Sequence, residues 1–279
     1  MGSDDSLKKM TRLYEIPLLY DLAFRRMAIA NNVDGLLACH ERFGSEHELK
    51  NVLELAAGPS RHALEFASRG YLATAIDNSP SMCFYATKLA GDLSVPLNVN
   101  NEDMLDFNIS ENFDLAFILL NSIGHVHTAT DLTRHLAAVS RHLGRDGLYV
   151  VEAHYPHWSG RESIKQSSWP VELEGIQLNV DFGASDDEFD VDTRVRSLKL
   201  HIYGSVMGNS VDLADHLMIR SWSADCFEET VAESGFFEIA AKLSSLDPDQ
   251  PFNPAEAGRL VYVLKNKDGL LSQNASKQQ

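Results

Sequence analysis

Short apolar runs alternate with longer amphipathic segments over residues 51–153. The runs of strand length are residues 51–55, 72–76, 97–100, 113–120 and 147–153. The segments with helical spacing are residues 59–69, 81–90 and 131–143, and each is followed by a glycine, Gly70, Gly91 or Gly144, where we expect a left-handed helix cap. This alternation predicts an α/β fold, in which helices cover both faces of a doubly wound, mostly parallel sheet.

The flanking segments have other periods. Residues 1–50 predict a helical cap, with two helices over residues 7–43 that could cover a site. Within residues 155–222 apolar and polar positions alternate over 176–182 and 198–202, with turn-rich breaks, which predicts a small antiparallel sheet inserted into the α/β domain. The α/β pattern resumes over 223–265, so 51–154 and 223–265 are expected to form one domain, and the polar residues 266–279 a flexible tail.

Composition and cysteine usage narrow the protein class. With 279 residues, 44% hydrophobic and 23% charged, the chain suits one large α/β domain with an insertion. No run approaches the roughly 18 apolar residues of a membrane helix, and residues 1–10 lack the apolar core of a signal peptide. The three cysteines lie far apart, which argues against a disulfide framework or a zinc site. We therefore expect a cytoplasmic protein without a bound metal.

The net charge of −16 bears on the choice of partner. Such a charge repels phosphate backbones and anionic lipid surfaces, so nucleic acids and membranes are disfavoured. Neutral or cationic small molecules remain the expected ligands.

A strand runs directly into a turn of small residues at VLELAAGPSR, residues 52–61. Asp77 closes the next strand 19 residues after Gly58, close to the spacing at which dinucleotide folds place an acid on ribose hydroxyls. A nicotinamide cofactor is disfavoured, because GxGxxG requires glycines where Ala56 and Arg61 stand, and because Glu54 would repel a pyrophosphate. S-adenosylmethionine has no phosphate, and its sulfonium and ammonium groups tolerate nearby carboxylates.

At these motifs the chain resembles the class I S-adenosylmethionine-dependent methyltransferases, mainly over residues 51–151. The first motif of that family is commonly a strand followed by GxGxG, and here Ala56 and Ser60 replace the outer glycines. The resemblance implies a Rossmann-like fold, ribose binding by Asp77, and contacts of Asp103 with the adenine amino group. The cofactor-binding residues that it suggests are Glu54, Ala56, Ala57, Gly58, Arg61, Asp77, Asn78, Met82, Asp103, Met104, Leu120 and Asn121.

Catalytic candidates follow the fourth and fifth strands. His125, His154 and Tyr155 lie near the expected crevice, where one of them could accept or position the proton of an amine acceptor. Tyr14 and Tyr20 could place a ring face over the sulfonium. Each of these residues also has a purely structural interpretation, as do Gly58 in an ordinary turn and Asp103 in a loop.

Together these features predict S-adenosylmethionine-dependent methyl transfer to a small molecule, with an amine as one acceptor class. The inserted sheet resembles those of glycine N-methyltransferase and the amino-sugar N,N-dimethyltransferases, and could select the acceptor or form a homodimer contact. Three alternatives stay open: another transferase that uses S-adenosylmethionine, a regulatory module that binds it without turnover, and a nicotinamide oxidoreductase.

Overall fold

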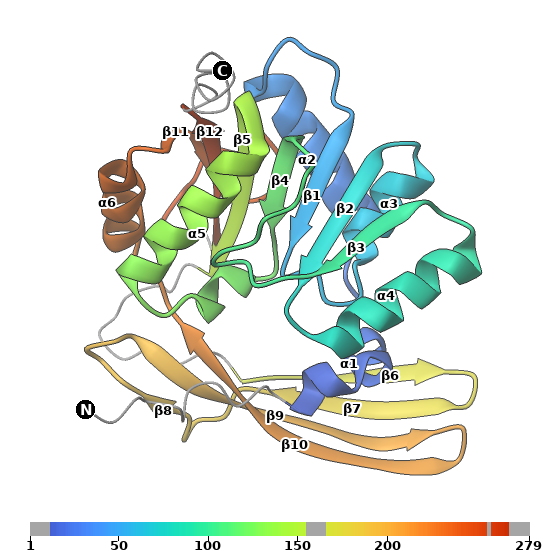
Figure 1. Ribbon diagram of the computed structural model, residues 1–279. Coiled ribbons are helices and arrows are strands. Elements are labelled where there is room, and N and C mark those ends of the chain that lie inside the picture. Colours follow the sequence, from blue (N-terminus) through green and yellow to red (C-terminus); the bar gives the residue numbers. More distant parts are fainter. Residues whose placement is uncertain (1–11, 155–165, 256–257, 268–279) are drawn as a thin grey trace.

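The computed structural model describes residues 12–154, 166–255 and 258–267 and contains a larger sheet of mostly parallel strands (Figure 1). Its seven strands run in the order β11-β12-β5-β4-β1-β2-β3. They are β1 (Asn51–Leu55), β2 (Leu72–Asp77), β3 (Leu97–Asn101), β4 (Phe113–Ile118), β5 (Leu143–His154), β11 (Phe237–Leu243) and β12 (Arg259–Asn266). Only β12 is antiparallel to its neighbours, so the predicted doubly wound α/β fold is confirmed.

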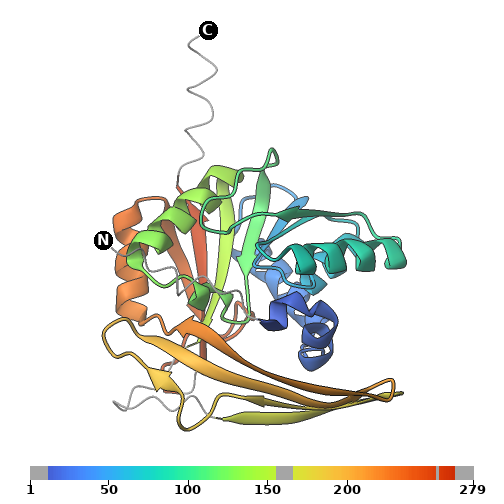
Figure 2. The same cartoon turned by 60° about the horizontal axis from the view of Figure 1, so that its bottom comes forward.

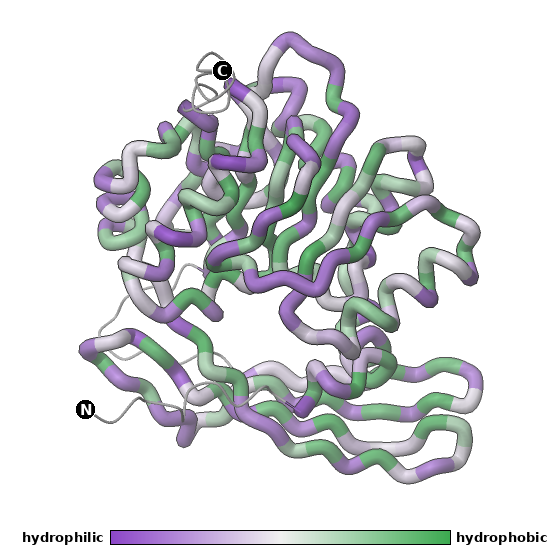
Figure 3. Tube along the Cα trace, viewed as in Figure 1, coloured by the Kyte–Doolittle hydropathy of each residue, from purple (hydrophilic) through white to green (hydrophobic). Residues whose placement is uncertain are grey.

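Helices cover both faces of this sheet, which explains why its central strands are apolar on both sides (Figure 3). One face packs against α2 and α3, and the other against α5 and α6, while α4 contacts β2 and β3. The helices are α1 (Pro17–Ala23), α2 (Ile29–Phe43), α3 (Arg61–Ser68), α4 (Pro80–Leu93), α5 (Ala129–His142) and α6 (Ala224–Ser234), with 3₁₀ turns η2 (Arg12–Glu15) and η3 (Ser122–His125). Two hydrophobic cores therefore sandwich the sheet.

A second, antiparallel sheet follows β5, as predicted for the insertion. It comprises β6 (Ser167–Leu173), β7 (Ile176–Phe182), β8 (Glu188–Phe189), β9 (Val195–Val206) and β10 (Asn209–Arg220). Figure 2 shows it as a separate layer below the carboxyl ends of the parallel strands. Its alternate residues are buried in a third core, together with apolar residues of η2 and α1. We call η2, α1 and the residues between α1 and α2 the cap. The cap thus lies between the two sheets.

Two of the three expected glycine caps are wrong. Gly70 is left-handed, with φ 94°, and follows α3 as predicted. By contrast, α4 continues through Gly91 to Leu93 and ends at Ser94, whose φ is 55°. Gly144 lies inside β5, because the chain passes from α5 into extended backbone without a left-handed turn.

Two further observations concern features expected from composition. Within the described ranges, no helix has both the length and the apolar character needed to cross a bilayer. All three cysteines of the chain lie in the described part and are free thiols.

Candidate active site

The loop between β1 and α3 has the backbone of a glycine-rich turn although it contains one glycine. Ala56, Gly58 and Ser60 are all left-handed, with φ of 48°, 52° and 57°. A left-handed residue other than glycine is strained by about 1–2 kcal/mol, so the surrounding structure must enforce the conformation. The motif therefore keeps its shape where its outer glycines are replaced. Because Ser60 is left-handed, α3 begins at Arg61 and not at the predicted Pro59.

Asp77 connects this loop to the end of β2. Its Oδ2 accepts a hydrogen bond from the Gly58 amide at 2.7 Å, and its Oδ1 accepts one from the Ser79 amide at 2.8 Å. Burial raises the pKa of Asp77, while these two amide bonds act in the opposite direction. Each carboxylate oxygen keeps a lone pair for a further donor. The predicted pairing of Gly58 with Asp77 is thus present, and the carboxylate fits a ribose diol.

Both carboxylate oxygens of Glu54 form hydrogen bonds within the protein. Its Oε1 lies 2.9 Å from His62 Nδ1, and its Oε2 accepts the Ala63 amide at 2.8 Å. Asn32 Nδ2 lies 3.1 Å from His62 Nε2, so the ring proton is on Nδ1 and is donated to Glu54. Glu54 also lines the cavity, and its contact with the cofactor stays a prediction.

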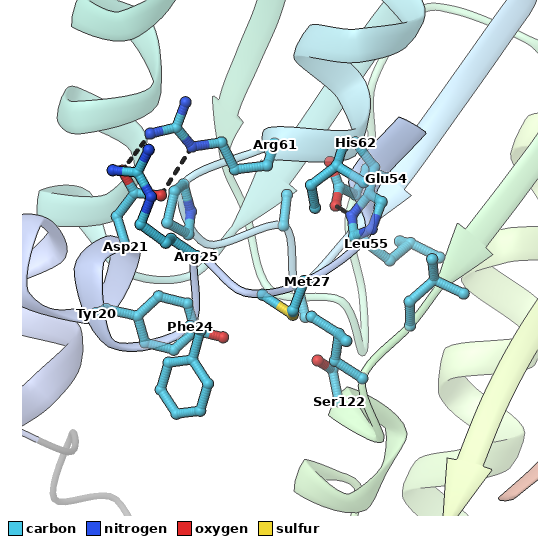
Figure 4. A pocket seen from close by; sticks show the side chains of 16 residues that line it. Tyr20, Asp21, Phe24, Arg25, Met27, Glu54, Leu55, Arg61, His62 and Ser122 are labelled. Carbon is cyan, nitrogen blue, oxygen red and sulfur yellow. Dashed lines mark hydrogen bonds and ion pairs between the residues drawn. The ribbon is translucent and has the colours of Figure 1, made fainter. Parts of the chain in front are cut away.

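A cavity opens between the cap and the carboxyl ends of β1 and β4 (Figure 4). On the cap side it is lined by the rings of Tyr20 and Phe24, whose centroids are 4.7 Å apart. On the sheet side its lining includes the predicted residues Glu54, Ala56, Ala57, Arg61 and Leu120. Aromatic faces beside a cavity attract cations, by about 0.5–2 kcal/mol. The cavity thus suits a ligand with a positive centre.

Polar contacts attach α1 to this cavity. Arg61 donates from Nε and Nη2 to the two oxygens of Asp21, which also accepts the hydroxyl of Tyr85 at 2.8 Å. Hydrogen bonding to Asp21 raises the pKa of Arg61. Arg25 also lines the cavity but makes no ion pair with any residue that the structure describes. Arg61, a predicted ligand contact, is therefore engaged, whereas Arg25 is available to an anionic group.

The chain after β4 forms a strained turn. The strand ends at Ile118 instead of the predicted Leu120, because Leu120 and Asn121 are left-handed, both with φ 59°. The Leu120 amide lies 3.3 Å from Glu152 Oε2, and Asn121 Oδ1 accepts the His154 amide at 2.9 Å. Leu120 lines the cavity, whereas the side-chain oxygen of Asn121 supports the turn.

His125 and Tyr14 form a pair at the edge of the cap. The Tyr14 hydroxyl and His125 Nε2 are 2.9 Å apart. Burial lowers the pKa of His125 to about 4 and raises that of Tyr14 well above its usual value. Both groups are therefore uncharged at neutral pH. Neither member of the pair lines the cavity, nor does His154, which is exposed. Tyr155 lies outside the described residues.

The adenine-side candidates have mixed environments. Asn78 and Asp103 are exposed, and Asp103 Oδ1 accepts the Leu105 amide at 2.9 Å. Met82 is only 1% exposed and its amide donates to Ser79, so it supports the start of α4 from within the core. The carbonyl oxygen of Met104 lies 2.8 Å from Nδ1 of the buried His135 on α5.

Sequence reasoning missed several residues of the cavity. Those not predicted are Asp21, Phe24, Arg25, Met27, Ile29, Leu55, Pro59, His62 and Leu119. The spacing of residues in and just after α1 gave a partial indication. Tyr20 is four residues before Phe24, and Asp21 is four residues before Arg25, so each pair shares one face of a helix. No sequence pattern indicates that these faces lie over β1, because that depends on the packing of the cap between two sheets.

The chain was compared with known proteins. Residues 52–147 match the family described as "Methyltransferase domain". A protein of Bacillus subtilis (strain 168) named "Putative methyltransferase YqeM" is 22% identical over 81% of this chain and 87% of its own length. The dTDP-3-amino-3,4,6-trideoxy-alpha-D-glucopyranose N,N-dimethyltransferase of Streptomyces venezuelae is 26% identical over 40% of this chain and 44% of its own length.

Solved structures give the same fold. An S-adenosylmethionine-dependent methyltransferase from Clostridium acetobutylicum ATCC 824 superposes with a TM-score of 0.75 at 15% identity. The superposition covers 91% of this chain and 99% of that one, so it extends beyond the α/β domain into the inserted sheet.

Proposed function

We propose that the chain is a class I S-adenosylmethionine-dependent methyltransferase that methylates the amine nitrogen of a small molecule held between the cap and the parallel sheet. The observation that supports this most strongly is the cavity between Tyr20, Phe24 and the left-handed loop at Gly58. It joins aromatic rings, the backbone of this loop and the Arg25 guanidinium, and the same loop is bonded through the Gly58 amide to the Asp77 carboxylate, which fits a ribose.

The residues present suit the cofactor as follows. Asp77 would accept the ribose hydroxyls, and the loop around Gly58 allows the backbone to approach a ligand closely, because a Cβ added there would find only Tyr20 within 4 Å, at 3.8 Å. Arg25 would hold the methionine carboxylate. When bound, S-adenosylmethionine supplies the electrophilic methyl group, so the protein need only align the acceptor and exclude water.

The Tyr14 and His125 pair does not line the cavity, so it would affect the acceptor indirectly, by joining η2 of the cap to η3 after β4. An amine attacks the methyl group only in its neutral form, so a neighbouring residue that keeps the amine protonated would slow the reaction. With a pKa of about 4, His125 is a poor proton acceptor but a good neutral hydrogen-bonding group. We assign it, together with Tyr14, to holding the cap in place over the cavity, and the proton released by the amine passes to solvent.

An amine substrate agrees with the charge of the protein and with its relatives. The net charge of −16 favours cationic or neutral ligands over nucleic acids. The Streptomyces venezuelae relative is named for dimethylation of an amino sugar. Three free thiols suit a reducing compartment, and we propose a cytoplasmic location.

The cofactor assignment is tested by calorimetry with S-adenosylhomocysteine. Asp77→Ala removes the acceptor of two ribose hydroxyls, so we expect Kd to rise by at least about tenfold. Asp114→Ala is the matched control, because Asp114 likewise accepts two backbone amides, those of Lys50 and Asn51, at the opposite end of β1. Unchanged affinity in Asp77→Ala would remove the assignment, and binding of NADH in place of S-adenosylhomocysteine would restore the oxidoreductase alternative.

The acceptor class is tested by turnover. A panel of amines, including dTDP-linked amino sugars and glycine, is incubated with S-adenosylmethionine, and methylated products are identified by mass spectrometry. We expect N-methylation of at least one amine. Tight binding of the cofactor without methylation of any member of a broad panel of amines, alcohols and thiols would favour a regulatory module.

A further inference from the structure

One side of α5 holds the loop that connects β3 to β4. His135 Nδ1 lies 2.8 Å from the carbonyl oxygen of Met104, near the start of this loop. At the far end of the helix, His142 Nε2 accepts the amide of Ile109 at 3.1 Å, and Arg141 donates to the segment between them. The loop that carries Asp103 is thus fixed from α5 and not from the larger sheet alone.

The hydrogen-bonding roles of His135 are determined by its partners. The Met104 carbonyl can only accept, so Nδ1 carries the proton, and Nε2 then accepts from the Tyr149 hydroxyl at 2.6 Å. Both side chains are 0% exposed. Burial lowers the pKa of His135 to about 4, so at physiological pH the ring is neutral and only this one tautomer satisfies both hydrogen bonds.

Such a network is costly for a core position. An aliphatic residue would fill the space between α5 and β5 without removing two polar side chains from water, and buried polar pairs are seldom the more stable choice. What they provide is a defined geometry. The geometry that His135 defines is that of Met104, whose neighbour Asp103 is exposed and retains one carboxylate oxygen without a backbone bond.

We propose that His135 is a positioning residue for the adenine end of the cofactor, a role that rests on the proposed function. By holding the Met104 carbonyl, it fixes the Asp103 carboxylate and the Met104 amide where they meet the adenine amino group and ring nitrogen. Tyr149 in turn fixes the orientation of the His135 ring. Neither residue touches the cofactor.

Two amide variants separate the two bonds of His135. The amide of His135→Asn reaches the position of Nδ1 and keeps a donor for Met104, whereas that of His135→Gln reaches the position of Nε2 and keeps the contact with Tyr149. Binding is measured by calorimetry for S-adenosylhomocysteine and for S-inosylhomocysteine, in which oxygen replaces the adenine amino group. For His135→Gln we expect the Kd of S-adenosylhomocysteine to rise about fivefold, the effect of one lost hydrogen bond, and that of the inosyl analogue to change less than about twofold. His135→Asn should stay within about twofold of the wild type for both ligands.

A purely structural role gives a different result. Ser140→Ala removes another buried hydrogen bond of α5, to Asn266, without touching the loop, and should lower stability while leaving both affinities unchanged. If His135→Gln weakens both ligands equally, or neither, the positioning role is refuted. If the wild-type protein binds neither ligand, the proposed function fails instead.

A measurement on the wild-type protein decides the matter even if neither amide variant folds. In protein labelled with ¹⁵N-histidine, the Nδ1 proton of His135 reports on its bond to Met104. It should shift when S-adenosylhomocysteine is added and shift less with the inosyl analogue. Equal shifts with both ligands, or no shift with either, would contradict the coupling between His135 and the adenine contacts.

Discussion

Replacing Ala56 by glycine should stabilise the protein, although alanine to glycine changes usually destabilise. Ala56 has a φ of 48°, and relief of this left-handed strain is worth about 1–2 kcal/mol. Glycine costs about 0.5–1 kcal/mol in backbone entropy, and loss of a half-buried methyl group costs about 0.4 kcal/mol. The free energy of unfolding should therefore rise by about 0.5 kcal/mol.

The adjacent residue provides the control. Ala57 is not left-handed, is 8% exposed, and donates its amide to Ile76. Ala57→Gly has no strain to relieve, so entropy and the lost methyl group should lower the free energy of unfolding by about 1.5 kcal/mol. The two variants have the same chemistry one residue apart, and they should differ by about 2 kcal/mol.

The assay is urea unfolding monitored by tryptophan fluorescence, with and without S-adenosylhomocysteine. A common m-value for both variants would confirm that they differ in stability and not in the compactness of the unfolded state. Equal destabilisation of Ala56→Gly and Ala57→Gly would show that Ala56 is not left-handed. The conclusion that the loop keeps a glycine-rich backbone would then fail with it.

Two further predictions concern the cap and the buried histidines. Asp21→Ala leaves Arg61 without its carboxylate, so the free energy of unfolding should fall by about 1–3 kcal/mol and S-adenosylhomocysteine should bind more weakly. Asp34→Ala breaks an exposed ion pair with Arg69 and should lower the free energy of unfolding by less than about 1 kcal/mol. Similar losses of stability in the two variants would contradict this prediction. His125 and His135 have pKa values lowered from 6.5 to about 4, so the unfolded state binds more protons between these values. Stability should be lost as pH falls from about 6.5 towards 4, by up to about 1.4 kcal/mol per pH unit for each histidine, and urea midpoints that stay constant between pH 7 and 5 would refute it.

The α/β core could be predicted because its signals are local. Each buried strand is a short apolar run, and the order of strands and helices along the chain determines parallel pairing on both sides of β1. The antiparallel sheet was equally visible, since Leu198, Leu200 and Ile202 alternate with polar residues. The position of β12 between β5 and β11 was not visible, because two strands at the end of a chain can pair in either order.

The site was harder to predict because its residues are defined by partners distant in sequence. Asp77 and Gly58 were found from a spacing that the fold imposes. The hydrogen bond between Glu54 and His62 could not be predicted, because His62 lies on the following helix and is identifiable as a partner only once α3 is placed. Likewise, Arg61 is bound by Asp21, 40 residues earlier, from a cap whose packing no local pattern specifies.

Several polar groups in this protein support loops around the site. Glu54 holds the start of α3, Asn121 holds the turn after β4, and His135 holds the loop after β3. The cap is held similarly, since Ser79 donates to the Tyr14 carbonyl at 2.9 Å. Methyl transfer needs alignment more than proton transfer, because the cofactor brings its own leaving group. A site of this kind should therefore show strong positioning contacts and a weak catalytic signature, which is the arrangement these residues form.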